Sequence, residues 1–372
     1  MKILMISSYY LPYLAGAELY VKEIAERLVK NGNKAAVLTK NLGNLKAFEV
    51  INDVKVYRVF SGNTSHLRSV IAFPKMFFNG LKMAKECSLI HAHITYPNGI
   101  IAYLIARSRK KPYIITLQGD ELMDYPEKRM LRMLKLPIGA ALRNADKVHC
   151  ISKALADAAV KNFGVAKDKT VIIPNGVDLA GFKNAKKIDL KKKYDAKKIL
   201  ISVSRLTDKN NIELVIRAMK HVDRQAKLII IGDGPNKQKL LKLKKDLKVR
   251  VEFLGNIEHD RIAGYLKGAD LFVRTPKTEG LGIVFLEAMA AGLPIITSNV
   301  GGIPDIVKHN ETGIITGNKD EKELAKAINS LLKDKKLSEK LMINGKEFIR
   351  DYDWGIIYKK TYQMYSELEQ LS

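Results

Sequence analysis

The chain has 372 residues, of which 47% are hydrophobic, and it carries a formal net charge of +25. A single hydrophobic core rarely organises a chain of this length, so we expect two domains. The two cysteines, Cys87 and Cys150, lie in apolar stretches without metal-ligand spacing, which excludes a disulfide framework and a structural zinc site and indicates a reducing compartment.

The N-terminal segment MKILMISSYYLPYLAGA has the lysine and the small residues of a signal peptide, but Ser7, Ser8 and Pro12 interrupt its apolar run. A strand over Lys2–Ile6, a glycine loop and a helix explain the same residues better. No uncharged apolar run in the chain reaches the length of a transmembrane helix. We therefore expect a cytoplasmic protein.

Short β-rich runs alternate with helical patterns along almost the whole chain, which is typical of parallel α/β architecture. The strands predicted in the first half are Lys2–Ile6, Lys34–Thr39, Val54–Phe60, Ser88–His91, Pro112–Leu117, Asp146–Ile151 and Thr170–Ile173. Those predicted in the second half are Ile199–Val203, Leu228–Ile231, Val251–Leu254, Leu271–Val273 and Pro294–Thr297. The predicted fold class is α/β, with two Rossmann-like, doubly wound parallel sheets, a hinge near residues 174–178 and a ligand cleft between the domains.

The stretch TEGLGIVFLEAMAAG carries two glutamates, Glu279 and Glu287, in an otherwise apolar segment. Two glycines break its first half, while IVFLEAMAA favours a helix. We therefore predict a loop and then a helix whose first free N–H groups, near Ile283 and Val284, form an anion site. Taken alone, the segment is equally compatible with a solvated loop glutamate and a polar helix position.

Four other loops are expected at the same edge of the sheets. Gly16 lets the backbone approach a ligand at the start of the first helix. Arg205 follows the strand ILISVS, where its planar guanidinium suits a diphosphate, with Lys209 nearby as a second cation. The turns GDGP and FLGN add Gly234 and Asn256 to this set.

In this order and spacing the motifs resemble glycosyltransferase family 4, retaining enzymes of the GT-B type. The resemblance covers nearly the whole chain and rests on Ala15-Gly16-Ala17-Glu18, His91-Ala92-His93, Pro174-Asn175-Gly176-Val177-Asp178, Ser204-Arg205-Leu206, Gly232-Asp233-Gly234-Pro235, the segment Glu279–Ala290 and Gly301-Gly302-Ile303-Pro304. It implies an N-terminal acceptor-binding domain of residues 1–177, to which the last helix, 355–372, returns. It also implies a nucleotide-sugar-binding domain of residues 178–354.

The resemblance assigns roles to the candidate residues. Glu287 accepts hydrogen bonds from the ribose hydroxyls, a role that suits a carboxylate, and Arg205 neutralises the leaving diphosphate. Glu279 lies beside the donor sugar, and the intervening backbone holds phosphate, which maps onto Gly280, Leu281, Gly282 and Ile283. The family needs no catalytic metal and no cofactor, because cations and oriented amides stabilise the charge of the UDP- or GDP-linked co-substrate.

The chain departs from the family in three places. Ala15 replaces the first glycine of a pair, and Asn210 stands where the family has its phosphate lysine, with Lys209 one residue early. Gln118-Gly119-Asp120 replaces a histidine loop, and Asp120 becomes a candidate for orienting the acceptor. His93 corresponds to a family histidine near the transferred sugar; a structural role, or a metal pair with His91, is the alternative.

The predicted function is transfer of a sugar, with retention of configuration, to a hydroxyl of a glycan or lipid-linked glycan. The alternatives are an epimerase or other GT-B enzyme without a second acceptor, and a non-catalytic basic protein on a membrane surface or nucleic acid. Lys and Arg are spread over helix faces rather than gathered with aromatics, which argues against a nucleic-acid partner. Two basic amphipathic segments, HLRSVIAFPKMFFNGLKMAKE and EKRMLRMLKLPIGAALR, fit either a core face or an anionic membrane surface.

Overall fold

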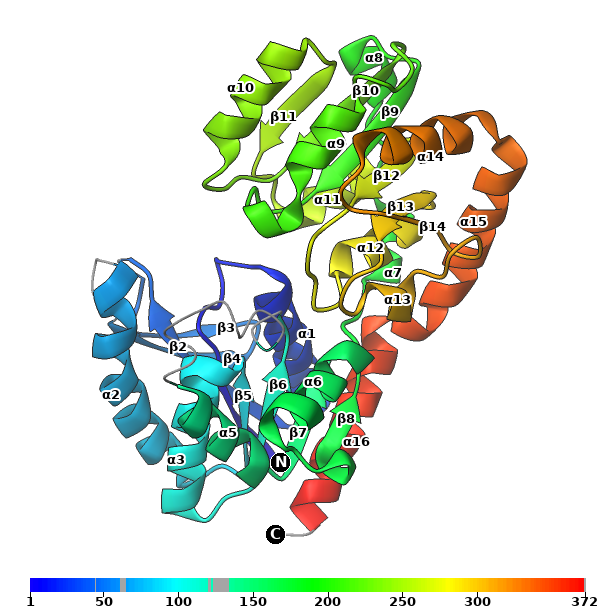
Figure 1. The fold of residues 1–372 in the computed structure, drawn as a ribbon. Coiled ribbons are helices and arrows are strands. Elements are labelled where there is room, and N and C mark those ends of the chain that lie inside the picture. The colour runs from blue at the N-terminus through cyan, green and yellow to red at the C-terminus, as the bar shows by residue number, and fades with distance from the viewer. Residues whose placement is uncertain (44, 61–64, 120–121, 123–133, 371–372) are drawn as a thin grey trace. The chain divides into compact units, whose positions relative to one another are not determined.

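The computed structural model describes residues 1–43, 45–60, 65–119, 122 and 134–370. The chain forms two compact units, one of residues 1–175 with 354–372 and the other of residues 176–353 (Figure 1). The division lies within two residues of the boundary expected from the sequence.

The first unit is built on an eight-stranded sheet in the described part of the chain, with the order β3-β4-β2-β1-β5-β6-β7-β8. Its strands are β1 (Lys2–Ile6), β2 (Lys34–Asn41), β3 (Phe48–Ile51), β4 (Val54–Phe60), β5 (Leu89–His93), β6 (Tyr113–Leu117), β7 (Lys147–Cys150) and β8 (Thr170–Ile172). The sheet is parallel, as predicted, except that β3 pairs with β4 in antiparallel orientation. The short edge strand β3 was not predicted, because half of its side chains are exposed and no apolar run marks it.

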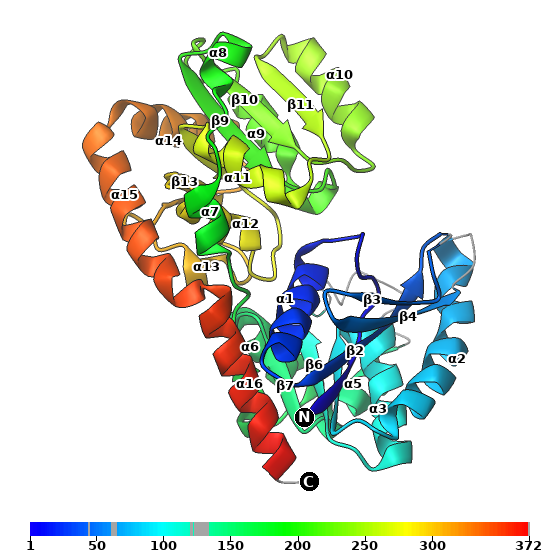
Figure 2. The same ribbon diagram turned by 180° about the vertical axis from the view of Figure 1, so that it is seen from behind.

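Helices cover both faces of this sheet, as right-handed crossovers require. They are α1 (Gly16–Lys30), α2 (Ser65–Ala84), α3 (Ile100–Arg109), α5 (Lys135–Asn144), α6 (Lys153–Phe163) and α16 (Trp354–Gln370). The two helices α1 and α16 pack against each other on one face, and α2, α3 and α5 follow one another on the opposite face (Figures 1 and 2). The apolar stripe of α1 is buried at Val21, Ile24, Ala25 and Leu28.

The second unit has a six-stranded parallel sheet in the order β11-β10-β9-β12-β13-β14. Its strands are β9 (Lys198–Val203), β10 (Ala226–Ile231), β11 (Val251–Gly255), β12 (Leu271–Arg274), β13 (Ile295–Ser298) and β14 (Ile314–Thr316). Its helices are α7 (Leu179–Asn184), α8 (Leu190–Tyr194), α9 (Ile212–Ala218), α10 (Lys237–Leu247), α11 (His259–Lys267), α12 (Ile283–Ala290), α13 (Ile303–Ile306), α14 (Glu321–Lys333) and α15 (Lys335–Phe348). A hydrophobic core joins α9, α10 and α14 to one face of the sheet.

Both sheets reverse their strand order once near the middle. In the first unit the reversal falls between β1 and β5, and in the second between β9 and β12. Loops that leave two such strands at their carboxyl ends diverge to opposite faces and leave a crevice, where α/β sheets bind ligands. None of the helices in the described part combines the length and the hydropathy needed to span a lipid bilayer.

Candidate active site

Backbone hydrogen bonds connect the loops at the carboxyl edge of the second sheet. The N–H of Leu206, after β9, donates to the carbonyl of Asp233, after β10, over 2.9 Å. The N–H of Gly302, after β13, donates to the carbonyl of Glu279, after β12, over 3.1 Å. Because the connections are made by the backbone, the loops keep their places independently of the side chains they present.

Two glycines make this close approach possible. Gly301 has a φ of +54°, and a Cβ there would lie 1.8 Å from the carbonyl oxygen of Glu279. A Cβ on Gly234 would lie 2.4 Å from the carbonyl oxygen of Leu206. Gly234 was predicted as a substrate-binding residue; in the structure its lack of a side chain lets two loops touch.

The segment with two glutamates forms a loop and then a helix, as predicted. Helix α12 begins at Ile283, directly after Gly282, whose φ is +87°. Leu281 is buried, and Gly280 donates its N–H to Oε1 of Glu279 over 3.0 Å. The start of α12 therefore has the Glu279 carboxylate and the glycine backbone beside it.

Arg274, the last residue of β12, was not predicted and lies at the centre of this arrangement. It is 6% exposed, and its Nη2 lies 2.6 Å from Oε2 of Glu279 and 2.8 Å from Oδ1 of Asn210. Its guanidinium carbon lies 5.5 Å from the ring centre of Phe285, in the first turn of α12. One sequence signal was available, because Arg274 ends a buried strand at the same edge where Arg205 follows one.

The positions predicted to bind diphosphate after β9 have different environments. Asn210 is buried and donates its Nδ2 to the carbonyl of Arg205 and to Oγ1 of Thr207. Arg205 and Lys209 are exposed. The asparagine therefore fixes the turn, while the two cations face outward from it.

Glu287 lies in the second turn of α12 and is 5% exposed. Its Oε1 lies 2.7 Å from Nε2 of His259, the first residue of α11. The predicted Asn256 is exposed in the loop that leads from β11 into that helix. Sequence reasoning missed His259 because Glu258, His259 and Asp260 read as a polar helix start.

In the first unit, His93 ends β5 and is fully buried. Asn98 donates its Nδ2 to the carbonyl of His93 over 2.7 Å and to Oγ of Ser8, after β1, over 3.1 Å. Asn98 therefore links the ends of β1 and β5, the two strands between which the order reverses. Asn210 lies at the corresponding place in the second unit, after β9. The next residue, Ile94, has a φ of +74°, a strained backbone conformation for a β-branched side chain and one that concentrates at functional sites.

The imidazole of His93 is neutral at physiological pH. Burial, together with the neighbouring His149, lowers the pKa of His93 to about 3. Its Nδ1 lies 3.2 Å from Nε2 of Gln118, and its Nε2 has no partner among the described residues. A neutral ring of this kind offers a hydrogen bond to a ligand rather than a charge.

His91 has a structural environment. One ring nitrogen lies 2.6 Å from the hydroxyl of Tyr365 in α16, and the other contacts Oγ1 of Thr116 in β6. Because both nitrogens are engaged, the metal pair of His91 with His93 is not favoured. Within the described residues there is no group of three or more potential ligands that could hold a metal ion.

Two further predicted residues complete the comparison with the sequence. Gly16 is the first residue of α1, is exposed, and has no atom within 4 Å of the position of a Cβ. The space beside it is therefore open to a ligand. Asp120 lies outside the described residues.

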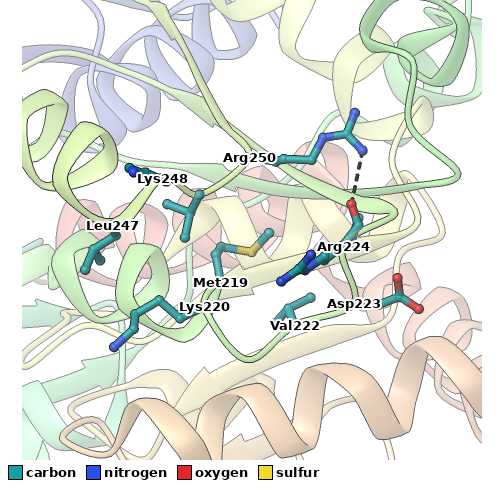
Figure 3. A pocket seen from close by; sticks show the side chains of 10 residues that line it. Met219, Lys220, Val222, Asp223, Arg224, Leu247, Lys248 and Arg250 are labelled. Atoms are coloured by element: carbon teal, nitrogen blue, oxygen red, sulfur yellow. Dashed lines mark hydrogen bonds between the residues drawn. The ribbon is translucent and has the colours of Figure 1, made fainter.

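A cavity of about 560 Å³ lies at the other end of the second sheet (Figure 3). Its lining residues run from the end of α9 to the first residue of β10 and from the last residue of α10 to the start of β11; they are Met219, Lys220, Val222, Asp223, Arg224, Ala226, Leu247, Lys248, Val249 and Arg250. None of the predicted site residues belongs to it. The guanidinium of Arg250 is already bonded to the carbonyl of Arg224, as the dashed line in Figure 3 shows.

Two Rossmann-like sheets, each with a ligand crevice at its reversal, define the GT-B class of glycosyltransferases, and solved structures share this fold. Sucrose-phosphate synthase from Thermosynechococcus elongatus is similar with a TM-score of 0.89 and 23% identity, over 100% of both chains. The Anabaena protein HepE in complex with UDP-glucose is similar with a TM-score of 0.83 and 24% identity, over 99% of this chain and 100% of that one.

The family models give the more specific assignment. The model of Glycosyltransferase Family 4 matches residues 14–180, and that of Glycosyl transferases group 1 matches residues 183–348. An uncharacterised glycosyltransferase of Methanocaldococcus jannaschii is 30% identical over 98% of both chains. The chain therefore belongs to the group 1 glycosyltransferases of family 4.

Proposed function

We propose that the protein transfers a sugar from a nucleoside-diphosphate sugar, UDP- or GDP-linked, to a hydroxyl group, with retention of configuration at the anomeric carbon. The observation that carries the proposal is that Arg274 joins the Asn210 turn, which presents Arg205, to the Glu279–Ile283 loop at the carboxyl ends of the neighbouring strands β9 and β12. A UDP-glucose complex is known for HepE, a protein of the same fold.

In the proposed complex, Glu287 accepts hydrogen bonds from the ribose and Glu279 from the donor sugar. The backbone from Leu281 to Ile283 donates to the diphosphate at the start of α12, where the helix dipole favours negative charge, while the N–H of Gly280 stays with Glu279. Arg205, exposed at the neighbouring turn, supplies a full positive charge. These groups are cations and oriented amides, so the proposed reaction needs neither a catalytic metal nor an organic cofactor.

The proposed transfer takes place on one face of the sugar. The bond between the acceptor oxygen and the anomeric carbon forms as the bond from that carbon to the diphosphate oxygen breaks. The acceptor proton passes to the departing diphosphate, and Arg205 stabilises the charge that develops there. An electrostatic group of this kind contributes about 3 kcal/mol to lowering a barrier.

The first unit supplies the acceptor side in this proposal. His93 donates a hydrogen bond as a neutral imidazole, and Asp120 orients the acceptor. A glycan or a lipid-linked glycan is the acceptor class that we propose, with contact to an anionic membrane surface for the lipid-linked case. A cytoplasmic location stays a prediction.

Ligand binding and turnover test the proposal together. A thermal-shift and calorimetric screen of UDP, GDP and ADP, and of their glucose or mannose conjugates, should identify one nucleotide that binds. The variants Arg205→Ala and Glu287→Ala should then lose about 100-fold in turnover of that donor. Arg205→Ala, at an exposed residue, should keep the unfolding temperature of the wild type, and Glu287→Ala, which removes the buried partner of His259, should stay folded at the assay temperature. Arg217→Ala, at a partly exposed arginine of α9, is the matched control. Unchanged turnover in both site variants would refute the assignment.

A further inference from the structure

Arg274 connects the two loops of the proposed donor site through a single nitrogen. Its Nη2 lies 2.6 Å from Oε2 of Glu279, which follows β12, and 2.8 Å from Oδ1 of Asn210, which follows β9. The residue is 6% exposed, so its guanidinium is shielded from water, whereas the side chain of Glu279 is 21% exposed. A buried charge of this kind has a large effect when its partner is removed.

The presence of Arg274 accounts for the asparagine at position 210. A lysine there would place an ammonium beside the buried guanidinium, and two like charges in a shielded place repel each other strongly. Asn210 instead offers its oxygen to Arg274 and its Nδ2 to the carbonyl of Arg205. At this place in the site the positive charge is therefore that of Arg274 at the end of β12, and Asn210 accepts a hydrogen bond from it.

Glu279 is held on both of its carboxylate oxygens. The N–H of Gly280 donates to Oε1 over 3.0 Å, and Arg274 binds Oε2. The ring of Phe285 lies beside the guanidinium, with 5.5 Å between its centre and the guanidinium carbon. With two fixed bonds, the carboxylate keeps one orientation; without Arg274, rotation about the side-chain bonds would be restrained only by one backbone N–H.

We propose that Arg274 is a positioning residue that orients the Glu279 carboxylate toward the donor sugar. The inference rests on the donor site of the proposed function and adds a residue that acts through Glu279. It predicts that loss of Arg274 affects events at the sugar. Recognition of the free nucleoside diphosphate should stay intact, because Asn210 keeps its bonds to the carbonyl of Arg205 and to Oγ1 of Thr207 and so still fixes the turn that presents Arg205.

The test compares Arg274→Met and Arg274→Lys with a matched control, Arg217→Met, which breaks a partly exposed arginine–glutamate pair with Glu213 in the same unit. Binding of UDP and GDP is measured by calorimetry, and kcat and KM are measured with the sugar conjugate of whichever nucleotide binds. Arg274→Met should lower kcat/KM about 30-fold or more with an unchanged Kd for the free diphosphate. A fall in diphosphate affinity as large as the fall in kcat/KM would show direct phosphate binding and overturn the inference.

A charge exchange gives an independent readout. Asn210→Lys alone should lower kcat, because it adds a cation beside Arg274, whereas in the Arg274→Met background the lysine should restore part of kcat by pairing with Glu279. A double variant no better than Arg274→Met would contradict the inference. If Arg274→Met does not fold, Arg274→Lys carries the test, since its ammonium keeps the buried charge.

If none of the nucleotides binds to the wild-type protein, the proposed function itself is rejected, and the variants need not be compared.

Discussion

Glu279 and Glu287 belong to one segment but have different partners. Glu279 is bound by Arg274 and by the backbone of Gly280, whereas the buried Glu287 is bound by His259. Glu279 lies in the loop before α12, whereas Glu287 lies in the second turn of α12 and points toward α11. This difference in environment is the physical reason to expect different roles.

Binding of the nucleotide without its sugar should separate the two glutamates. Glu287→Gln removes a charged acceptor from the proposed ribose site, so the Kd of the free nucleoside diphosphate should rise about tenfold or more. Glu279→Gln should leave that Kd unchanged and lower kcat with the sugar conjugate. Calorimetry with the diphosphate and its conjugate measures both effects; equal losses of diphosphate affinity in the two variants would contradict the assignment.

Gly301 should be intolerant of any side chain. Its φ of +54° disfavours other residues, and a Cβ would meet the carbonyl oxygen of Glu279 at 1.8 Å. Gly301→Ala should therefore destabilise the second unit by more than the roughly 1 kcal/mol of left-handed strain alone. Gly32→Ala is the control, because Gly32 has a φ of +77° with nothing within 4 Å. Hydrogen exchange measures the loss of stability in the second unit for Gly301→Ala and in the first unit for Gly32→Ala. Equal losses would show that the close approach of Gly301 to the carbonyl of Glu279 is unimportant.

At the scale of helices and strands, the alternation of β and helical patterns predicted the parallel sheets and the loop-then-helix form of the α12 segment. The edge strands β3 and β14 escaped prediction because they are short and only partly buried. Arg274 and His259 escaped it for a different reason. Their roles depend on which loops lie side by side across the sheet, and the order of strands in space is not written in any local pattern.

The centre of the first sheet contains three buried histidines on β5 and β7, namely His91, His93 and His149. Burial lowers the pKa of His149 to about 4 and, with His149 nearby, that of His93 to about 3. Burial, together with the other two histidines, also lowers the pKa of His91 well below its usual value. Unfolding exposes these rings to water, where they titrate near pH 6.5. The unfolded chain therefore binds more protons than the folded one below that pH.

The free energy of unfolding of the first unit should be highest above pH 6.5 and should fall as the pH drops from 6.5 toward about 4, by roughly 1.4 kcal/mol per histidine for each pH unit. The single tryptophan, Trp354, is buried in this unit, with 6.0 Å between the centres of its ring and that of Tyr20. Its fluorescence therefore reports the unfolding of this unit in urea. His149→Gln should reduce the slope, while His221→Gln, in the second unit, should not. A slope unaffected by His149→Gln would refute this explanation.

On the scale of the whole molecule, the last helix belongs to the first unit although it follows the second in sequence. Tyr365 of α16 binds His91 over 2.6 Å, and Thr361 binds the hydroxyl of Tyr20 in α1 over 2.9 Å. Folding of the first unit therefore depends on residues that are synthesised after the whole of the second unit.

Truncation after Asp353 should reveal this dependence. Removal of α16 exposes the apolar face of α1 and leaves His91 and Tyr20 without these partners, so hydrogen exchange in β5, β6 and β7 should accelerate strongly. Protection in β9, β10 and β12 should persist, and so should binding of the nucleoside diphosphate. Loss of protection in both units to the same extent would show that they unfold together.

The backbone connections among the loops of the second unit have a practical consequence for protein engineering. Since main-chain atoms hold the loops in register, residues such as Lys277 and Thr278 are suitable positions for saturation mutagenesis aimed at a new donor preference. The glycines at 234 and 301 should stay constant in such libraries. Directed evolution would then vary the side chains of these loops while the backbone hydrogen bonds that hold the loops stay unchanged.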